Sequence, residues 1–425
     1  MATAAIPETE KQDTVTVEAP HPWDVSVSDI YVEDRWQPIF REMRETAPIN
    51  KVTGSAFGDY WNVTTHKPIQ HVEALPDIYS SDVRNGGITV VDEKALGIAE
   101  HENFSLPMFI AMDRPKHTEQ RRTVAPAFTP AEMKRMEGDI RRRTAEILDD
   151  LPRGESFDWV DRVSIELTTQ MLAILFDFPW EDRRKLTFWS DWAGDVEKSL
   201  TPESREERMG HLMEMAGYFK NLWTERLNKP EAPDLLSRMI HSDAMREMDE
   251  LEFMGNLVLL IVGGNDTTRN TMSGYAYGLE QFPGERKRLE ENPDLIPNAV
   301  QEVIRWQTPL AHMRRTATED HELFGHAIAA GDKVILWYIS ANRDESVFDR
   351  PDEIIVDRDN ARRQLAFGYG IHRCVGARLA ELQVRILLEE MAARRLRANV
   401  IGEPERVSAC FVHGYRQMPV ELSEY

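Results

Sequence analysis

Hydrophobic residues recur along much of the chain at the three- and four-residue spacing of amphipathic helices. In residues 34–46 this spacing places Trp36, Ile39, Phe40 and Met43 on one face of a helix. Most of the residues between them are polar or charged and fall on the opposite face. The pattern therefore predicts a helix that packs one side against a core.

Further elements follow from similar patterns. A second helix is predicted over residues 65–75, and residues 130–228 are predicted to be mostly helical. Short runs bounded by turn residues predict strands over residues 49–53, 59–64 and 331–338. We therefore expect many helices and a small β region.

The longest predicted helix spans residues 249–281 and is almost uncharged over residues 253–264. At 1.5 Å per residue it is roughly 50 Å long, enough to cross the whole molecule. Residues 263–268, Gly-Gly-Asn-Asp-Thr-Thr, suit a plain buried helix poorly. We expect a local groove here, with Thr267 bonded back to the preceding turn. A kink with satisfied polar groups is the alternative.

Two segments lack a clear period. Residues 80–110 carry apolar patches without helical spacing, and a long irregular segment of this kind often forms a binding loop or lid. The alternative is that these apolar residues belong to the core. Residues 407–421 alternate weakly and are predicted to form a hairpin that closes a pocket from a second side.

No linker rich in proline, glycine and serine divides the chain of 425 residues. We therefore expect a single domain over residues 31–425, preceded by a flexible tail over residues 1–30. Hydrophobic residues make up 41% and charged residues 29%, which is typical of a globular protein with a large core.

The charge balance disfavours several partners. Asp and Glu number 73 against 51 Lys and Arg, so the formal net charge is −22. Binding to nucleic acid or to an anionic membrane surface is therefore not expected. The N-terminal residues lack the pattern of a secretory signal. The most apolar run, residues 257–262, is far too short to be a membrane anchor.

The two cysteines of the chain are Cys374 and Cys410, which excludes a disulfide framework and favours a cytoplasmic location. Cys374 follows Gly368 and Gly370, which permit a tight turn, and it directly precedes a predicted helix. A helix N-terminus stabilises a negative sulfur, and a thiolate held in this way is able to ligate haem iron. A buried structural cysteine after a glycine turn is the alternative.

The segment from Phe367 to Gly376 resembles the haem-binding signature of the cytochrome P450 superfamily, F-G-x-G-x-[H/R]-x-C-x-G, at every fixed position. This resemblance implies a mostly α fold with a small β-rich lobe. It also implies haem b, held between the long central helix and the helix after the cysteine, with Cys374 as the axial ligand of the iron. The implied cofactor-binding residues are His117, Arg121, Gly263, Arg315, Ala366, Phe367, Gly368, His372, Cys374 and Gly376.

Further motifs occur in the order that the superfamily requires. His117 and Arg121 are four residues apart and so lie on one helical face. Together with Arg315 they match the residues that contact the haem propionates. Asp266 and Thr267 match the acid and alcohol of the superfamily that admit the protons consumed in O₂ activation.

Glu302 and Arg305 form an E-x-x-R pair on one face of a predicted helix. Taken alone, such a pair is usually a weak surface ion pair. In the superfamily it forms a buried network with a third residue, which Arg358 matches here. The role that this implies is structural rather than catalytic.

Longer stretches, residues 108–113, 259–270, 304–310 and 312–316, resemble the bacterial terminal alkane and fatty-acid hydroxylases. This implies hydroxylation of the terminal methyl of linear medium-chain substrates with O₂. The implied electron source is a ferredoxin and its NAD(P)H-dependent reductase. A narrow apolar channel would have to present the chain end-on. The expected substrate contacts are Val262, Leu310 and Met313 near the iron, and Ile88, Val90, Ile110 and Phe411 in the outer wall.

An acidic enzyme needs a local basic patch to dock an acidic ferredoxin. Two groups of arginines are candidates for that patch. They are Arg362, Arg363, Arg373 and Arg378 around the cysteine loop, and Arg141, Arg142 and Arg143 elsewhere in the chain.

Three alternatives stay open. The same fold can hydroxylate another small hydrophobic substrate, such as a terpenoid. It can also use peroxide, although Asp266 and Thr267 favour O₂ activation. A haem-binding protein without turnover is a remote third alternative, because nothing that resembles a signalling or DNA-binding module is appended.

Overall fold

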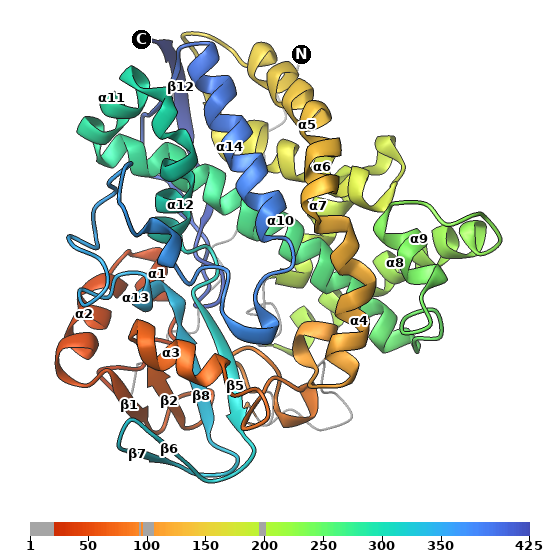
Figure 1. The fold of residues 1–425 in the computed structure, drawn as a ribbon, viewed down its shortest axis with the longest axis vertical. Helices are drawn as coiled ribbons and strands as arrows, with labels where there is room; N and C mark the ends of the chain where they lie inside the picture. The colour runs from red at the N-terminus through yellow and green to blue at the C-terminus, as the bar shows by residue number, and fades with distance from the viewer. Residues whose placement is uncertain (1–20, 93–94, 97–105, 195–200) are drawn as a thin grey trace, which may run out of the picture.

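The computed structural model describes residues 21–92, 95–96, 106–194 and 201–425. Helix α10 (Glu250–Gln281) runs through the middle of the molecule, and the other long helices surround it (Figure 1). A smaller lobe rich in strands lies at the lower left of this view. The mostly α fold with a small β-rich lobe is thus confirmed.

The larger lobe is helical. Its helices are α4 (Lys116–Val124), α5 (Pro130–Asp150), α6 (Glu166–Phe176), α7 (Arg184–Gly194), α8 (Pro202–Arg226), α9 (Leu235–His241), α11 (Pro283–Glu291), α12 (Ile296–Gln307) and α14 (Ala377–Ala393). Helices α6, α7, α8, α12 and α14 contact α10 directly. The central helix is therefore enclosed on several sides, as its apolar sequence predicts.

Helix α10 begins where the sequence predicts it. The carboxylate of Asp249 caps it by accepting a hydrogen bond from the backbone N–H of Glu252 at 2.8 Å. The helix continues without a break through the glycine pair at 263–264. Thr267 Oγ1 donates to the carbonyl oxygen of Gly263 at 2.9 Å, which confirms the predicted bond to the preceding turn.

The smaller lobe is built on a five-stranded sheet in the order β1-β2-β8-β5-β3. The pair β2–β8 is parallel, and the other neighbours are antiparallel. The strands are β1 (Ile49–Val52), β2 (Tyr60–Val63), β3 (Tyr79–Ser80), β5 (His312–Ala317) and β8 (Lys333–Trp337). The short helices of this lobe are α1 (Asp29–Val32), α2 (Trp36–Thr46), α3 (His66–Glu73) and α13 (Tyr338–Ala341).

Three small sheets complete the described strands. They are the hairpin β6 (His321–Leu323) with β7 (His326–Ile328), the pair β10 (Glu405–Arg406) with β11 (Tyr415–Gln417), and the sheet of β4 (Ser156–Asp158), β12 (Pro419–Glu424) and β9 (Leu396–Val400). In place of the predicted hairpin over residues 407–421, β10 and β11 pair across a long connection, and residues 419–421 belong to β12 of another sheet. That connection carries Cys410 and Phe411.

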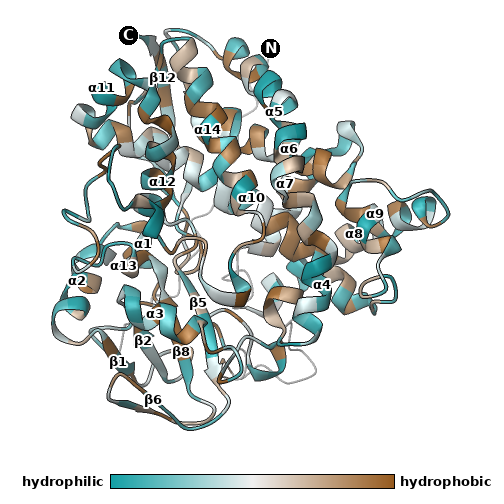
Figure 2. Ribbon diagram, in the orientation of Figure 1, coloured by the Kyte–Doolittle hydropathy of each residue, from teal (hydrophilic) through white to brown (hydrophobic). Residues whose placement is uncertain are grey.

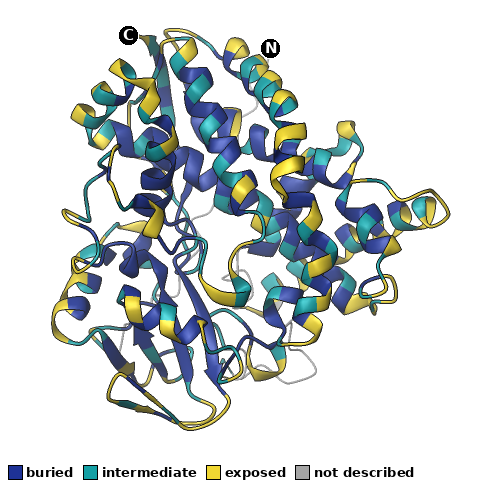
Figure 3. Ribbon diagram, in the orientation of Figure 1, coloured by how far each residue is buried: buried dark blue, intermediate teal, exposed yellow. Residues whose placement is uncertain are grey.

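Hydropathy and burial follow the same pattern across the fold. The outer surfaces of α5 and α11 are hydrophilic and exposed (Figures 2 and 3). Every residue of β5 and β8 is buried. Among the helices of the described ranges, none combines the length and the apolar character that a membrane span requires.

Of the predicted tail, residues 1–20 lie outside the described residues, and residues 21–30 pack against the fold. Val25 is fully buried and Ile30 is 7% exposed, and both pack in a core cluster with Trp36 and Phe40. Residues 21–30 pack against the apolar face of α2. The sequence of this segment did not indicate that packing.

Candidate active site

Cys374 lies in a tight loop, between the short 3-10 helix Gly370–His372 and the start of α14. Its backbone N–H donates to the carbonyl oxygen of Phe367 at 2.8 Å. Gly368 and Gly370 both have φ +67°, a conformation that favours glycine. At Gly370 a Cβ would come within 2.2 Å of a backbone oxygen of α3, so a side chain would clash there. The glycine turn is therefore needed for this loop to form.

The thiol of Cys374 is exposed, but to an internal cavity that it lines rather than to bulk solvent. Burial within the protein raises the pKa of this thiol. The backbone N–H groups of Gly376 and Ala377, together with Arg121, act in the opposite direction. These donors suit a thiolate whose negative charge is shared with a metal ion.

The cavity has a volume of about 310 Å³ and lies between α10, the cysteine loop and the strand-rich lobe. Its walls come from parts of the chain that are far apart in sequence. Six of the seven predicted substrate-contacting residues line it: Ile88, Ile110, Val262, Leu310, Met313 and Phe411.

Val90 is the exception among the predicted contacts. It is fully buried in a core cluster with Trp337 and Ile339 and is not among the residues that line the cavity. Its neighbours Ile88 and Thr89 do line the cavity, so the prediction for Val90 itself is wrong. The backbone turns between these residues, and an apolar run gives no sign of which side chains face inwards.

The described parts of the irregular segment 80–110 contribute to the cavity wall. The lining residues from it include Leu106, Met108 and Phe109, together with Ile88 and Ile110. Residues 93–94 and 97–105 lie outside the described residues.

One edge of the cavity carries buried cationic and imidazole groups. The rings of His117 and His372 lie 4.3 Å apart, and none of their four nitrogens has a hydrogen-bond partner within the described ranges. Burial lowers the pKa of His117 to about 4 and lowers that of His372 as well. Arg121 and Arg315 line the same cavity. Buried donors without a partner are costly, so this edge fits a group that brings its own anionic acceptors.

The residues present thus fit the cofactor that the sequence implies. Every one of the predicted cofactor-binding residues lines this single cavity, from the thiol at one wall to the basic groups at the edge. Gly263 on α10 leaves open space where a side chain would begin, because no atom outside its own stretch of helix backbone lies within 4 Å of a Cβ built there. A flat ring system can therefore approach the backbone of α10.

Two residues of this edge carried no signal in the sequence. Glu73, at the end of α3, lines the cavity, and its Oε1 lies 3.3 Å from Nη2 of Arg315. The hydroxyl of Tyr338 donates to the same oxygen at 2.7 Å. Burial raises the pKa of Glu73 to about 7. Neither residue belongs to a motif, and only the tertiary fold brings them to Arg315.

Asp266 is buried in the wall formed by α10, and it also borders the cavity. Its Oδ1 accepts hydrogen bonds from Ser190 Oγ at 2.8 Å and from Asn265 Nδ2 at 3.2 Å. Arg269 lies 3.3 Å from Asp266 and 2.7 Å from Asp191, whose side chain is 44% exposed. Burial raises the pKa of Asp266 to about 6. A chain of charged groups thus links the protein surface to a carboxyl group able to hold or release a proton.

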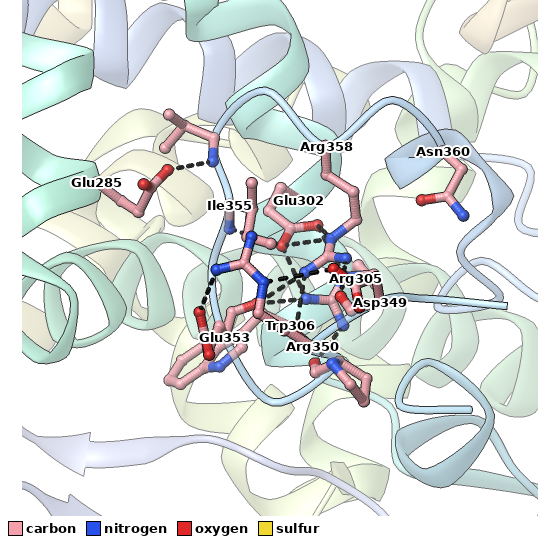
Figure 4. Close-up of polar contacts among 12 residues, drawn as sticks. Glu285, Glu302, Arg305, Trp306, Asp349, Arg350, Glu353, Ile355, Arg358 and Asn360 are labelled. Carbon is pink, nitrogen blue, oxygen red and sulfur yellow. Dashed lines mark hydrogen bonds and ion pairs between the residues drawn. The ribbon is translucent and has the colours of Figure 1, made fainter. Parts of the chain in front are cut away.

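Glu302, Arg305 and Arg358 form a buried charge network (Figure 4). Arg305 Nε and Nη2 each donate to Glu302 at 2.8 Å. Arg358 Nε lies 2.9 Å and 3.0 Å from the two carboxylate oxygens. Both arginines also donate to backbone carbonyls of residues 349–353. The network therefore ties α12 to the segment that leads to Cys374.

The two candidate basic groups differ in the structure. Arg362, Arg363, Arg373 and Arg378 are all exposed, and no ion pair is observed for them within the described residues. The arginines at 141–143 each pair with at least one carboxylate at an N–O distance of 3.0 Å or less. Their charge is therefore largely balanced, and only the group around the cysteine loop forms an uncompensated basic surface.

Comparison with known proteins agrees with this site. The family model described as cytochrome P450 matches residues 56–394. The structure of cytochrome P450-153 from Novosphingobium aromaticivorans is 65% identical, with a TM-score of 0.89 over 95% of this chain and 100% of that one. The structure of CYP153D17 from Sphingomonas sp. PAMC 26605 is 67% identical, with a TM-score of 0.90 over 95% and 99% of the two chains.

A curated relative carries a functional name. Linalool 8-monooxygenase of Pseudomonas putida is 34% identical over 94% of this chain and 98% of its own. The matched family model, the shared fold and this relative agree with the thiol, the basic edge and the apolar cavity described above. The chain belongs to the cytochrome P450 family and is a monooxygenase that works with a haem iron cofactor, O₂ and a redox partner.

Proposed function

We propose that this monooxygenase hydroxylates the terminal methyl group of linear medium-chain alkanes, fatty acids or related aliphatic compounds. The observation that carries the proposal is the apolar part of the cavity wall, which includes Val262, Leu310 and Met313. These side chains are apolar and offer no hydrogen bond to orient a substrate. The shape of the cavity is thus the main feature that selects which carbon of the substrate reacts.

The chemistry makes a narrow cavity necessary. A terminal C–H bond is stronger than its internal neighbours, so an enzyme that reacts at the methyl has to present it ahead of weaker bonds. An apolar wall that admits the chain end-on does this by burying the methylene groups, each worth about 0.8 kcal/mol. The position of the methyl group in the cavity then decides which carbon reacts, rather than the strength of its C–H bond.

The proposed cofactor is haem b, with Cys374 as the ligand of its iron. His117, Arg121, His372 and Arg315 would hold its carboxylates at the basic edge of the cavity. When bound, this cofactor supplies the oxidising chemistry that inserts one atom of O₂ into a C–H bond. Ala366, Phe367, Gly368 and Gly376 would border one face of it, and Gly263 the other.

Asp266 and Thr267 are proposed to manage protons on the α10 side of the cavity. Asp266 is linked through Arg269 to Asp191 at the surface, and the pKa of Asp266 is raised to about 6 by burial. Such a group can take up and release a proton near neutral pH. Thr267 offers a hydroxyl beside it and holds that hydroxyl against the carbonyl of Gly263.

The proposed electron donor is a ferredoxin with its NAD(P)H-dependent reductase, and the proposed location is the cytoplasm. The exposed arginines around the cysteine loop support an acidic partner at this face. Neither cysteine forms a disulfide within the described residues, and the thiol at position 374 is best preserved in a reducing compartment.

The relatives favour two substrate classes. The methyl-branched lipid omega-hydroxylase of Mycobacterium bovis is 32% identical over 90% of this chain and 90% of its own, and its name describes a lipid substrate and ω-hydroxylation. The linalool 8-monooxygenase favours a second candidate function, hydroxylation of a terpenoid. The cavity wall is apolar in either case, so binding measurements are needed to decide between them.

A spectral titration tests the proposal. The haem-loaded enzyme is titrated with alkanes, alcohols and fatty acids of graded length, and with linalool, while the haem absorption is followed. We expect a saturable change for linear chains, with affinity that rises with length until the cavity is filled. A response to linalool alone would contradict the proposal and support the terpenoid alternative.

A further inference from the structure

His312 connects two separate segments of the cavity wall. It is fully buried on β5, and both nitrogens of its ring are used. Nε2 accepts a hydrogen bond from the backbone N–H of Val90 at 3.1 Å. Nδ1 lies 2.9 Å from the backbone carbonyl oxygen of Cys410. One imidazole therefore joins the segment before residue 92 to the connection between β10 and β11.

The two partners fix the protonation of this ring. A carbonyl oxygen only accepts hydrogen bonds, so Nδ1 must carry the hydrogen and donate it to Cys410. Nε2 is then unprotonated and accepts from Val90. Burial lowers the pKa of His312 to about 4, so the neutral ring persists at neutral pH. The bridge is thus a stable feature rather than one of several tautomers.

Each bridged segment carries residues that line the cavity. Ile88 and Thr89 lie beside Val90 on one segment, and Phe411 and Val412 follow Cys410 on the other. The ring of Phe411 also packs edge-on against His312, with centroids 5.2 Å apart. His312 itself is not among the cavity-lining residues, so it acts on the cavity only through its neighbours.

We propose that His312 is a positioning residue for substrate specificity, because it fixes the two walls that carry Ile88 and Phe411 and so determines which carbon is oxidised. The inference rests on the proposed function for the identity of that carbon. Each wall also has further links to β5 or to the residues just before it, among them the bonds from Arg314 N to the carbonyl of Ile88 at 2.7 Å and from Ala311 N to the carbonyl of Phe411 at 2.8 Å. Those backbone bonds hold each wall separately, whereas His312 holds both walls with one side chain.

Loss of the bridge would remove one hydrogen bond from the backbone N–H of Val90 and one from the backbone C=O of Cys410, both of which are buried. Such groups shift until they find water or another partner, since an unsatisfied buried group is costly. The walls would then separate and give the substrate chain more room. A small displacement of the reacting group can cost roughly 100-fold in rate, so the product distribution is a sensitive readout.

Three variants separate the two halves of the bridge. His312→Asn keeps an amide near the position of Nδ1 and so retains the bond to Cys410. His312→Gln reaches the position of Nε2 and retains the bond to Val90. His312→Phe keeps a ring against Phe411 and Trp337 but removes both bonds. A matched control is His66→Phe, since His66 is also buried and bonds to the backbone carbonyl of Arg363 at 2.7 Å.

Two readouts are measured on the haem-loaded variants: the product distribution from the best linear substrate, and the dissociation constant of that substrate from spectral titration. We expect His312→Phe to lower the ratio of terminal to internal products by roughly 3- to 10-fold and to weaken binding. The product ratios of His312→Asn and His312→Gln should lie between those of the wild type and of His312→Phe. The control His66→Phe should leave the ratio unchanged.

A wild-type product ratio and dissociation constant in His312→Phe would overturn the inference. If that variant does not fold, unchanged values in both His312→Asn and His312→Gln overturn it equally. If the wild-type enzyme oxidises an internal carbon, the proposed function fails. In that case a product distribution that differs between His312→Phe and the wild type still supports the inference on His312, and an unchanged distribution contradicts it.

Discussion

Leu310 and Val262 border the cavity from two different elements, Val262 from α10 and Leu310 from the residues before β5. We predict that Leu310→Phe or Val262→Phe shifts oxidation towards an internal carbon or shortens the longest accepted chain. The expected change in product ratio is about 10-fold, because a difference of one methylene group in an apolar pocket has an effect of this order. Product analysis by gas chromatography measures it. Unchanged regioselectivity in both variants would show that these side chains do not contact the substrate.

Glu73 gives a prediction about pH. Burial raises its pKa from 4.5 to about 7, so the folded protein favours the protonated acid. The contribution of a carboxyl group with a raised pKa is fully present below pH 4.5 and is lost as the pH rises through 7. We therefore expect the free energy of unfolding of Glu73→Gln, relative to that of the wild type, to rise by about 3 kcal/mol as the pH increases from 4.5 to 8.

Urea unfolding of the two haem-loaded proteins at several pH values checks this prediction. The difference between their midpoints should grow in favour of the variant as the pH rises. A difference that stays constant, or that grows in favour of the wild type, would mean that Glu73 is ionised in the folded protein at neutral pH.

Single residues also mark the limit of prediction from sequence. Cys374, His117 and Arg315 belong to motifs with fixed spacing, so their convergence on one cavity was predictable. Glu73 stands alone at the end of a short helix, and only the packing of α3 against the cysteine loop brings it there. Val90 was misplaced because neighbouring residues of an irregular segment can face either the core or the cavity.

At the scale of elements, the charge network of α12 anchors the segment that precedes Cys374. Glu302 and Arg305 are fully buried, and Arg358 is nearly so. Removal of one member leaves the others buried without a partner, at a cost of roughly 3–5 kcal/mol. We predict that Glu302→Ala or Arg305→Ala yields protein without haem, as measured by the ratio of haem to protein after purification.

Arg350→Ala is the matched control for this network. Its side chain is 58% exposed, and the bond to Arg358 comes from its backbone rather than its side chain. It should retain its haem. Full haem content in the Glu302 and Arg305 variants would refute an anchoring role for the network.

Elements with a strong local pattern were predictable, and those that depend on distant pairing were not. The predicted helix at 249–281 differs from α10 by one residue, because its cap and its apolar run are both local signals. The sheet of β4, β12 and β9 was not predicted as a sheet. Its strand β12 pairs Val420 with Phe157 and with Val400, and no local pattern encodes such partners.

At the scale of the whole molecule, the acidic net charge of −22 contrasts with the basic surface around the cysteine loop. We predict that electron transfer from an acidic ferredoxin slows as ionic strength rises above about 0.1 M, where the Debye length is about 10 Å. Stopped-flow reduction of the haem-loaded enzyme at increasing salt concentrations measures this.

Two variants locate the docking surface. The double variant Arg362→Glu with Arg363→Glu should weaken the salt dependence and slow reduction at low salt. Arg142→Glu should have little effect, because Arg142 already pairs with Asp139 and Glu146. A rate that is independent of salt, or equal effects of both changes, would exclude this surface as the docking site.

The architecture of the whole molecule was predictable from the order of its motifs, whereas the shape of the cavity was not. Order along the chain identifies the family, and the family implies the fold. The cavity depends on Ile88, Phe411 and Val262, which lie on segments far apart in sequence. Their distances across the cavity are set by tertiary contacts such as those of His312, which no sequence motif describes.

Terminal hydroxylation is tested most directly by the products formed from a linear substrate. The haem-loaded enzyme is supplied with a surrogate ferredoxin, its reductase, NAD(P)H and O₂, and the products from a medium-chain alkane and a fatty acid are identified by mass spectrometry. We predict the primary alcohol and the ω-hydroxy acid as the main products. Secondary alcohols as the main products would contradict terminal hydroxylation.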